Sequence, residues 1–106
     1  MMVSTQIHDS TRGVPGGRIP VELDLFVEGQ GWKEVGYGIT NADGDIADFG
    51  ELKVPGVYRL MYDIGTYMPE TYFPSIAITF EVRDITERHR VALVLSAYGY
   101  TTYRMS

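Results

Sequence analysis

The chain has 106 residues, of which 44% are hydrophobic and 22% charged, a size and composition typical of one folded domain rather than a disordered chain. Nine basic residues against fourteen acidic ones give a net charge of −5, which argues against phosphate backbones and anionic membranes as partners. The sequence contains no cysteine, so disulfides, thiolate catalysis and cysteine-ligated zinc are excluded.

Short apolar runs with a two-residue period indicate β-strands along the whole chain, since alternate residues of a strand point to opposite faces. Clusters of glycine and proline at residues 12–17, 28–31, 41–44 and 54–56 mark the turns between them. The only candidate helical turn, at residues 67–71, is limited by nearby prolines. In chain order, the expected strands are residues 3–8, 21–28, 32–39, 57–62, 76–83, 90–95 and 101–105.

Seven or eight strands with one apolar face each predict an all-β fold, a two-sheet antiparallel sandwich of about eight short strands in one domain over residues 1–106. The strand at residues 90–95 adds information because its second face carries Arg90, Ala92 and Val94. A solvent-facing side would usually be more polar, so this face predicts contact with another subunit or a ligand. The alternative is a patch that is covered within a monomer.

The histidines and serines suggest no common catalytic motif. No cluster of metal ligands accompanies His8 or His89, so neither a metal site nor a cofactor is expected. Because His89 follows the charged pair Glu87 and Arg88, it is interpreted as a surface side chain. The serines show no nucleophile elbow. The tyrosines of residues 97–104 favour a strand with interface aromatics, because the acidic balance argues against nucleic acid.

Several segments, in order along the chain, carry a family resemblance. Residues 9–21 are similar to D-T-x-x-G-x-P-A-x-x-V-P-V, residues 40–44 match T-N-x-D-G, and residues 56–60 match G-x-Y-R-L. Residues 73–74 and 80–84 are similar to F-F-P and F-x-V-x-D, and residues 93–106 to L-L-L-S-P-x-G-Y-S-T-Y-R-G-S. These are the motifs of the 5-hydroxyisourate hydrolases, which the chain therefore resembles; transthyretin belongs to the same superfamily.

The resemblance implies an eight-stranded sandwich that forms a homotetramer, a dimer of dimers, with two ligand sites in a channel between the dimers. Residues 63–74 are fewer than in the family, so its short helix is expected to be reduced or absent. Gln6 stands where the hydrolases have a catalytic histidine, Asp45 where an arginine follows T-N-x-D-G, and Arg90 where they have a second histidine. Transthyretin, with lysine, glutamate and threonine there, is not matched either.

These replacements change the chemistry that the resemblance implies. An amide at position 6 cannot transfer a proton near neutral pH, and a carboxylate at position 45 reverses the charge that would stabilise an oxyanion. Ordinary 5-hydroxyisourate hydrolysis is therefore not expected. Strand parity places His8 on the same face as Gln6, whereas His89 should face away from Arg90.

We therefore expect an altered site in the channel. The expected catalytic residues are His8 as acid or base, Asp45 as its partner and Arg90 as the group that holds an anion. The expected substrate-binding residues are Gln6, Ala92, Val94, Thr101, Tyr103, Arg104 and Ser106.

Three functions remain open on the sequence. The first is an enzyme that hydrolyses, isomerises or cyclises a small, flat, cyclic metabolite without metal or cofactor. The second is a binding or carrier protein in which Asp45 and Arg90 neutralise each other, or form an interface pair with no ligand at all. The third is residual 5-hydroxyisourate hydrolysis in purine catabolism. No apolar run approaches the roughly 20 residues that span a bilayer, and no secretory signal is evident, so a cytoplasmic location is the default expectation.

Overall fold

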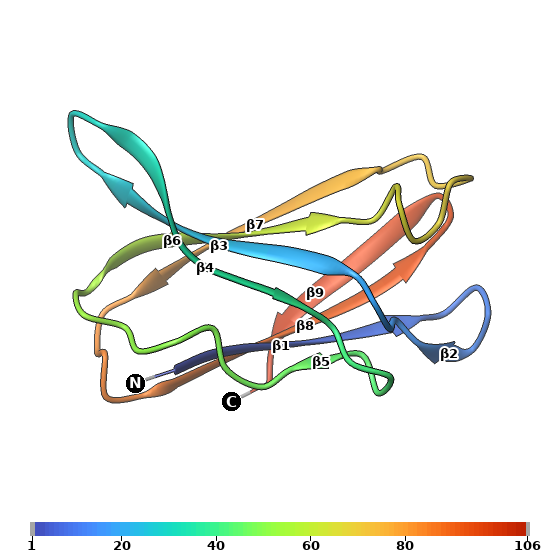
Figure 1. Cartoon of the computed structure of the whole chain (residues 1–106), viewed down its shortest axis with the longest axis horizontal. Helices are drawn as coiled ribbons and strands as arrows, with labels where there is room; N and C mark the ends of the chain where they lie inside the picture. The colour runs from blue at the N-terminus through green and yellow to red at the C-terminus, as the bar shows by residue number, and fades with distance from the viewer. Residues whose placement is uncertain (1, 106) are drawn as a thin grey trace.

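Two β-sheets packed face to face make up the protein, whose structure is a computed structural model that describes residues 2–105 (Figure 1). Sheet A contains β1 (Met2–Asp9), β2 (Val14–Pro15), β5 (Asp45–Ile46), β8 (Arg88–Ser96) and β9 (Gly99–Arg104). Sheet B contains β3 (Pro20–Val27), β4 (Gly31–Ile39), β6 (Gly56–Asp63) and β7 (Ser75–Val82). The all-β sandwich predicted from the sequence is thereby confirmed.

The strand pairing differs from the prediction in two respects. Two-residue strands, β2 and β5, pair with β1, and β2 lies inside a segment interpreted as a turn. In addition, β1 and β8 run parallel, from Met2 opposite Arg88 to Asp9 opposite Leu95, whereas the other pairings among the described residues are antiparallel. The two-residue period is the same for both directions, so it could not reveal this exception.

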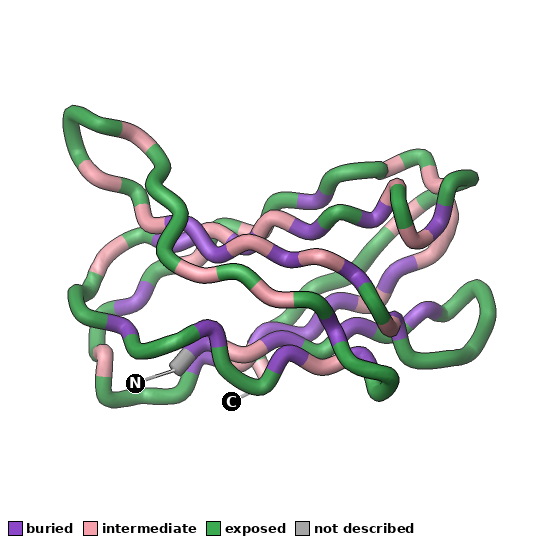
Figure 2. The backbone as a smooth tube through the Cα atoms, in the orientation of Figure 1, coloured by how far each residue is buried: buried purple, intermediate pink, exposed green. Residues whose placement is uncertain are grey.

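The core lies between the sheets and is built from the inward-facing residues of the alternating strands. Figure 2 shows buried residues along the strands and exposed ones in the loops and at the projecting tip of the β3–β4 hairpin. Each large aliphatic side chain in this layer contributes roughly 1.5–3 kcal/mol relative to exposure. The largest fully buried side chains are Ile7, Ile19, Leu23, Tyr58, Leu60, Tyr62, Ile64, Met68, Leu93 and Leu95.

One polar contact crosses the core. The Thr5 hydroxyl donates to the carbonyl oxygen of Val91 at 2.8 Å, so the Tyr62 hydroxyl is the donor in its 2.8 Å bond to Thr5 Oγ1. Burial raises the pKa of Tyr62, while the bond to Thr5 opposes that shift. The phenol therefore stays neutral and joins β6 of sheet B to β1 of sheet A.

The segment between β6 and β7 forms turns instead of a helix. The Met68 N–H donates to Ile64 O at 2.8 Å, and the Thr71 N–H donates to Met68 O at 3.0 Å, but the described residues 63–74 contain no helix. The expected loss of a helix in this segment is confirmed. Residues 2–105 also contain no helix long and apolar enough to cross a membrane.

Candidate functional site

The outer face of sheet A, which points away from the core, gathers most of the expected site residues. Gln6 of β1 lies between Asp45 of β5 and Ala92 of β8, and Ala92 lies opposite Tyr103 of β9. Residues that are opposite one another in adjacent strands share a face, so these four side chains form a row across the sheet. Parallel rows add Ser4 with Arg90, and His8 with Val94 and Thr101.

A hollow of about 420 Å³ lies at the β5 side of this face. It is lined by Gln6, Asp45 and Arg90, which the sequence identified, and by Arg88 and Asp48, which it did not. Within residues 2–105, no ion pair involves any of these four charged side chains. Two guanidinium groups and two carboxyl groups therefore surround one hollow without neutralising each other in direct contacts.

Arg88 and Asp48, which the sequence analysis did not identify, differ in whether a sequence pattern could have predicted them. Arg88 lies two residues before Arg90 in the same strand, so the parity argument that selected Arg90 also places Arg88 on this face. Asp48 follows β5 in an irregular segment, where its carboxyl accepts the Gly50 N–H at 2.8 Å. No periodic signal in the sequence could have found Asp48.

His8 lies in a separate hollow of about 100 Å³, which also contains Asp43, Val94 and Tyr103. Gln6 lines both hollows. Within the described residues, the His8 ring makes no hydrogen bond or ion pair with a carboxylate. The expected contact between His8 and Asp45 is therefore not formed within the described chain, and Asp43 is the acidic residue that shares the hollow with the imidazole.

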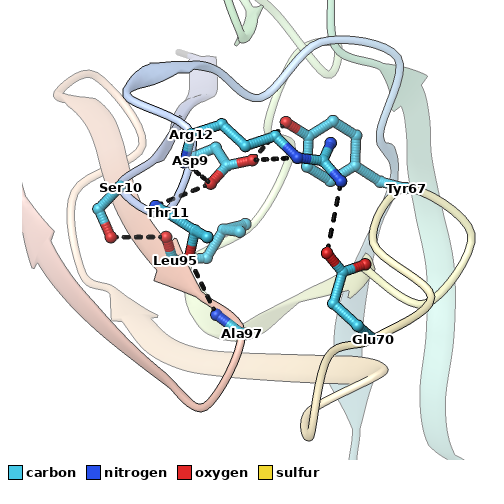
Figure 3. A network of polar contacts seen from close by, with 8 residues as sticks. All are labelled: Asp9, Ser10, Thr11, Arg12, Tyr67, Glu70, Leu95 and Ala97. Atoms are coloured by element: carbon cyan, nitrogen blue, oxygen red, sulfur yellow. Dashed lines mark hydrogen bonds and ion pairs between the residues drawn. The ribbon is translucent and has the colours of Figure 1, made fainter.

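The end of β1, immediately after His8, is held by a polar network around Asp9 (Figure 3). Asp9 is completely buried; its Oδ1 accepts two backbone N–H groups of the following loop at 3.0 and 3.1 Å, and its Oδ2 accepts the Tyr67 hydroxyl at 2.7 Å. Arg12 lies 3.9 Å from the same Oδ2 and 3.5 Å from Glu70. Burial, followed by the bond to the Asp9 carboxylate, raises the pKa of Tyr67, so the phenol remains a donor.

The turn before β5 determines where Asp45 stands. The side-chain oxygen of Asn41 accepts the backbone N–H groups of Asp43 and Asp45 at 2.9 and 3.0 Å, which shapes the turn. Gly44 has φ of +80°, and a Cβ atom there would collide with the carbonyl oxygen of Ile7. The Gly44 carbonyl oxygen accepts the Ile7 N–H at 2.8 Å, so the turn is fixed directly onto β1.

Not all of the remaining expected site residues lie on the outer face of sheet A. Thr101 is exposed beside Val94, and Tyr103 is 55% exposed at the β9 end of the row. Arg104 pairs with Val91 in the register and is on the other face, where its Nη2 donates to the Arg88 carbonyl oxygen at 2.9 Å and lies 3.8 Å from Glu87. Ser106 lies outside the described residues.

The interpretation of His89 as a surface side chain is wrong. His89 is only 5% exposed, its ring centroid lies 6.5 Å from that of Phe80, and its Nε2 is 3.3 Å from the Asp84 carbonyl oxygen. Position 89 shares the inward-facing parity of Val91, and this outweighs the charged neighbours on which the interpretation rested. The same parity turns His89 away from Arg90, as expected.

Comparison with known proteins gives consistent matches. The sequence matches the HIUase/Transthyretin family over residues 3–105. It is 34% identical to the 5-hydroxyisourate hydrolase of Salmonella typhimurium, over 99% of this chain and 81% of that protein. It is 32% identical to the uric acid degradation bifunctional protein TTL of Arabidopsis thaliana over 98% of this chain, which spans only 37% of the length of that protein.

Solved structures give the same picture of the fold. The 5-hydroxyisourate hydrolase of Klebsiella pneumoniae has a TM-score of 0.85 at 27% identity, with 100% of both chains covered. Sea bream transthyretin in complex with thyroxine has a TM-score of 0.91 at 23% identity, covering 99% of this chain and 95% of that one. The second likeness, at that identity, concerns the fold alone.

Proposed function

Because the chain belongs to the HIUase/Transthyretin family, we propose that it is an enzyme that acts on a small, flat, cyclic metabolite through acid–base chemistry of its own side chains. The observation that carries this proposal is the hollow on the outer face of sheet A, where Asp45, Asp48, Arg88 and Arg90 stand without direct ionic partners. Charged groups that lack a partner within the fold are available to a ligand.

The charges suggest the class of substrate. The two arginines suit an anionic oxygen such as an enolate, a carboxylate or a phenolate, because a guanidinium presents several N–H donors in one plane. The two aspartates suit a ligand with ring N–H groups, because carboxylate oxygens accept hydrogen bonds from such donors. A cyclic amide or ureide has both features on one flat ring, and it fits a hollow of about 420 Å³.

The proposed chemistry divides two tasks between these groups. A carboxylate or His8 removes a proton from water or from a ring N–H, and Arg90 holds the negative charge that then develops on a carbonyl oxygen. Such a division serves hydrolysis, isomerisation or cyclisation equally. It differs from ordinary 5-hydroxyisourate hydrolysis because, by the family resemblance, Gln6, Asp45 and Arg90 occupy the places of a histidine, an arginine and a second histidine.

Within one subunit, His8 does not reach Asp45. We infer that two copies meet through the outer faces of their A sheets, as in the tetramer implied by the family resemblance, so that the imidazole of one copy approaches the hollow of another. The half-buried Val94 and the 55% exposed Tyr103 beside His8 support an apolar contact at this place. The complete site would then belong to the assembly.

The experiment is a turnover assay on freshly prepared 5-hydroxyisourate and on a panel of cyclic ureides and lactams, followed by ultraviolet absorbance and mass spectrometry. With an accepted substrate, Asp45→Asn and Arg90→Gln should each lower kcat/KM by about 10²-fold or more, as expected for a lost proton-transfer or charge-stabilising group. His8→Ala should lower turnover while ligand affinity stays much closer to normal. Arg83→Gln, at a side chain that is 85% exposed just after β7, is the matched control.

The alternative is a carrier, in which the same charges hold a ligand without converting it. Its signature would be a panel compound that binds, depends on Arg90 for binding, and is recovered chemically unchanged after long incubation. Acceleration of 5-hydroxyisourate decay that survives Asp45→Asn and Arg90→Gln would instead assign a residual hydrolase activity to other residues. Either result contradicts the proposed catalytic roles.

A further inference from the structure

A buried carboxylate on the outer face of sheet B has one oxygen without a hydrogen-bond partner. Asp24 of β3 is 1% exposed, and its Oδ2 accepts two bonds from the Arg59 guanidinium, from Nε at 3.1 Å and Nη2 at 2.8 Å. Its Oδ1 is buried and has no partner. A buried carboxylate oxygen without a hydrogen bond lowers the stability of the fold. Asp24 Oδ1 therefore needs a hydrogen-bond donor, and Arg59 donates only to Oδ2.

Two further carboxyl groups surround Asp24. Glu22 precedes it by two residues and therefore shares its face of β3, and Glu34 lies directly opposite it on β4. On the other side, Arg59 of β6 lies opposite Asp24, and its guanidinium carbon is 4.2 Å from the centroid of the Trp32 ring. Of these three carboxyl groups only that of Asp24 pairs with the guanidinium, so two further acidic groups lie beside it with no bond to that cation, a combination that favours retention of a proton.

The other groups that face Glu22 supply no positive charge. Tyr37 of β4 and Met61 of β6 lie opposite it in the register, and Asp63 lines the same hollow as Glu22. Lys33 of β4 pairs with Leu25, so it points to the opposite face of the sheet. Among residues 2–105, no group of three acidic or histidine side chains is arranged to hold a metal ion.

We propose that Glu22 keeps a proton and donates it in a hydrogen bond to Asp24 Oδ1, which makes these two residues a proton-binding site that empties as the pH rises past neutrality. A protonated carboxyl group has an O–H donor that an ionised one lacks. The proton therefore satisfies the one buried oxygen that Arg59 leaves open. It also removes one of the negative charges that β3 and β4 would otherwise bring together.

The electrostatics agree with this geometry. The hydrogen bond with Asp24, then burial and the charge of Asp24, and then Glu34 raise the pKa of Glu22 from 4.5 to about 7. Between these two values, the folded protein keeps a proton that the unfolded chain has released. The stabilisation is therefore fully present below about pH 4.5 and is lost as the pH rises through about 7.

The position of Glu22, Asp24 and Glu34 in the sheet predicts which strand is destabilised when the proton is released. β4 is an edge strand of sheet B, paired only with β3 in the described chain, and the β3–β4 register shifts between Leu23 and Asp24. Loss of the proton places Glu22 and Asp24, both ionised, beside Glu34 across this irregular pairing. Repulsion between the two strands should loosen β4 before it affects the rest of the sandwich.

The first test is a carboxyl ¹³C NMR titration of protein labelled at glutamate. One glutamate resonance should titrate with a midpoint near 7, and that resonance should be missing in Glu22→Gln but present in the matched control Glu28→Gln, a change in the exposed hairpin tip. Glu34→Gln should lower the midpoint only partly, because Asp24 is the larger cause. If no glutamate titrates above about pH 6, or if the high midpoint persists in Glu22→Gln, the proposal fails.

The second test reads the consequence for stability. The Tm of the wild type should fall between pH 5.5 and pH 8, and the exchange of β4 amide protons, corrected for intrinsic rate, should become faster. Glu22→Gln should show a smaller fall and little change in β4 exchange, because its side-chain amide donates to Asp24 Oδ1 at every pH. An equal fall in wild type and Glu22→Gln would overturn the assignment to this site.

Discussion

At the scale of single residues, the carboxylate of Asp9 differs from those of Asp45 and Asp48 in the donors that it meets. Asp9 is completely buried and accepts three hydrogen bonds at 2.7 to 3.1 Å, so its charge is stabilised within the fold. Asp45 and Asp48 are more accessible and have no ionic partner among the described residues. Asp45 and Asp48 therefore have capacity left for a ligand, which is why the proposed site lies there.

Tyr67→Phe tests how strongly the Asp9 network is held. The change removes the 2.7 Å bond to a buried carboxylate and should lower the free energy of unfolding by about 1.5–3 kcal/mol, the usual range for a bond to a charged group. Chemical denaturation at neutral pH measures this loss. Tyr98→Phe, at a side chain that is 78% exposed, is the control and should change stability by less than about 0.5 kcal/mol. Equal losses in both variants would contradict the role of the network.

The sequence predicted single residues well where strand parity applied and poorly where packing decided. Parity placed His8 on the face of Gln6 and turned His89 away from Arg90, whereas Asp45 was identified only through the family resemblance; in the structure Gln6, Asp45 and Arg90 line one hollow. Parity cannot predict that Asp24, which faces outward, is covered by its neighbours, because burial depends on side chains from three strands. Nor can it assign Asp48, which lies outside the strands.

At the scale of elements, the site depends on a short unit formed by β1, the turn at residues 41–44 and β5. This unit brings Asp45 to Gln6 through only two register pairs, so the turn geometry decides where the carboxyl group stands. Gly44 is the critical point, because its positive φ and its contact with Ile7 leave no room for a side chain.

Gly44→Ala should therefore be much more damaging than Gly13→Ala. Both positions have positive φ, but a Cβ atom at Gly13 meets nothing within 4 Å, whereas one at Gly44 collides with the backbone of β1. We expect a loss of about 1 kcal/mol at Gly13 and about 3 kcal/mol or more at Gly44, measured by thermal or chemical unfolding. Similar losses at the two sites would show that the contact with β1 is not a constraint.

The strands themselves were predictable because a half-buried sheet requires alternation of apolar and polar residues. Tyr58, Leu60 and Tyr62 illustrate this, since these alternate residues of the expected strand at 57–62 are all buried. The two-residue strands β2 and β5 were not predictable, since two residues contain no period. These two short strands are defined only by their pairing with β1 in the folded structure.

At the scale of the whole molecule, the outer face of sheet A is the surface through which copies are proposed to meet. It combines a half-buried Val94 with the 55% exposed ring of Tyr103, next to the small hollow that holds His8. Apolar area of this kind, beside charged groups, is typical of subunit interfaces. On this proposal the assembly completes the site, because it brings His8 of one copy to the charged hollow of another.

Val94→Arg should break this contact. Placing a charge at a packed subunit interface leaves it without a partner, so the mass in solution, measured by light scattering, should fall from four times 11.9 kDa to a smaller species. Val57→Arg, at a valine that is 38% exposed on sheet B, is the matched control and should leave the mass unchanged. A wild-type protein that is already monomeric would remove the shared site.

The parallel pairing of β1 with β8 has a consequence for biosynthesis. β1 precedes β8 by most of the described chain, yet the two strands pair along the whole of β1, and the Thr5–Val91 contact joins residues 86 positions apart. Sheet A can therefore close only after β8 has been translated, whereas the β3–β4 hairpin and β6 can pair earlier. Until then, the β1 segment remains an unpaired strand whose backbone hydrogen-bonding groups are available to chaperones or to wrong partners.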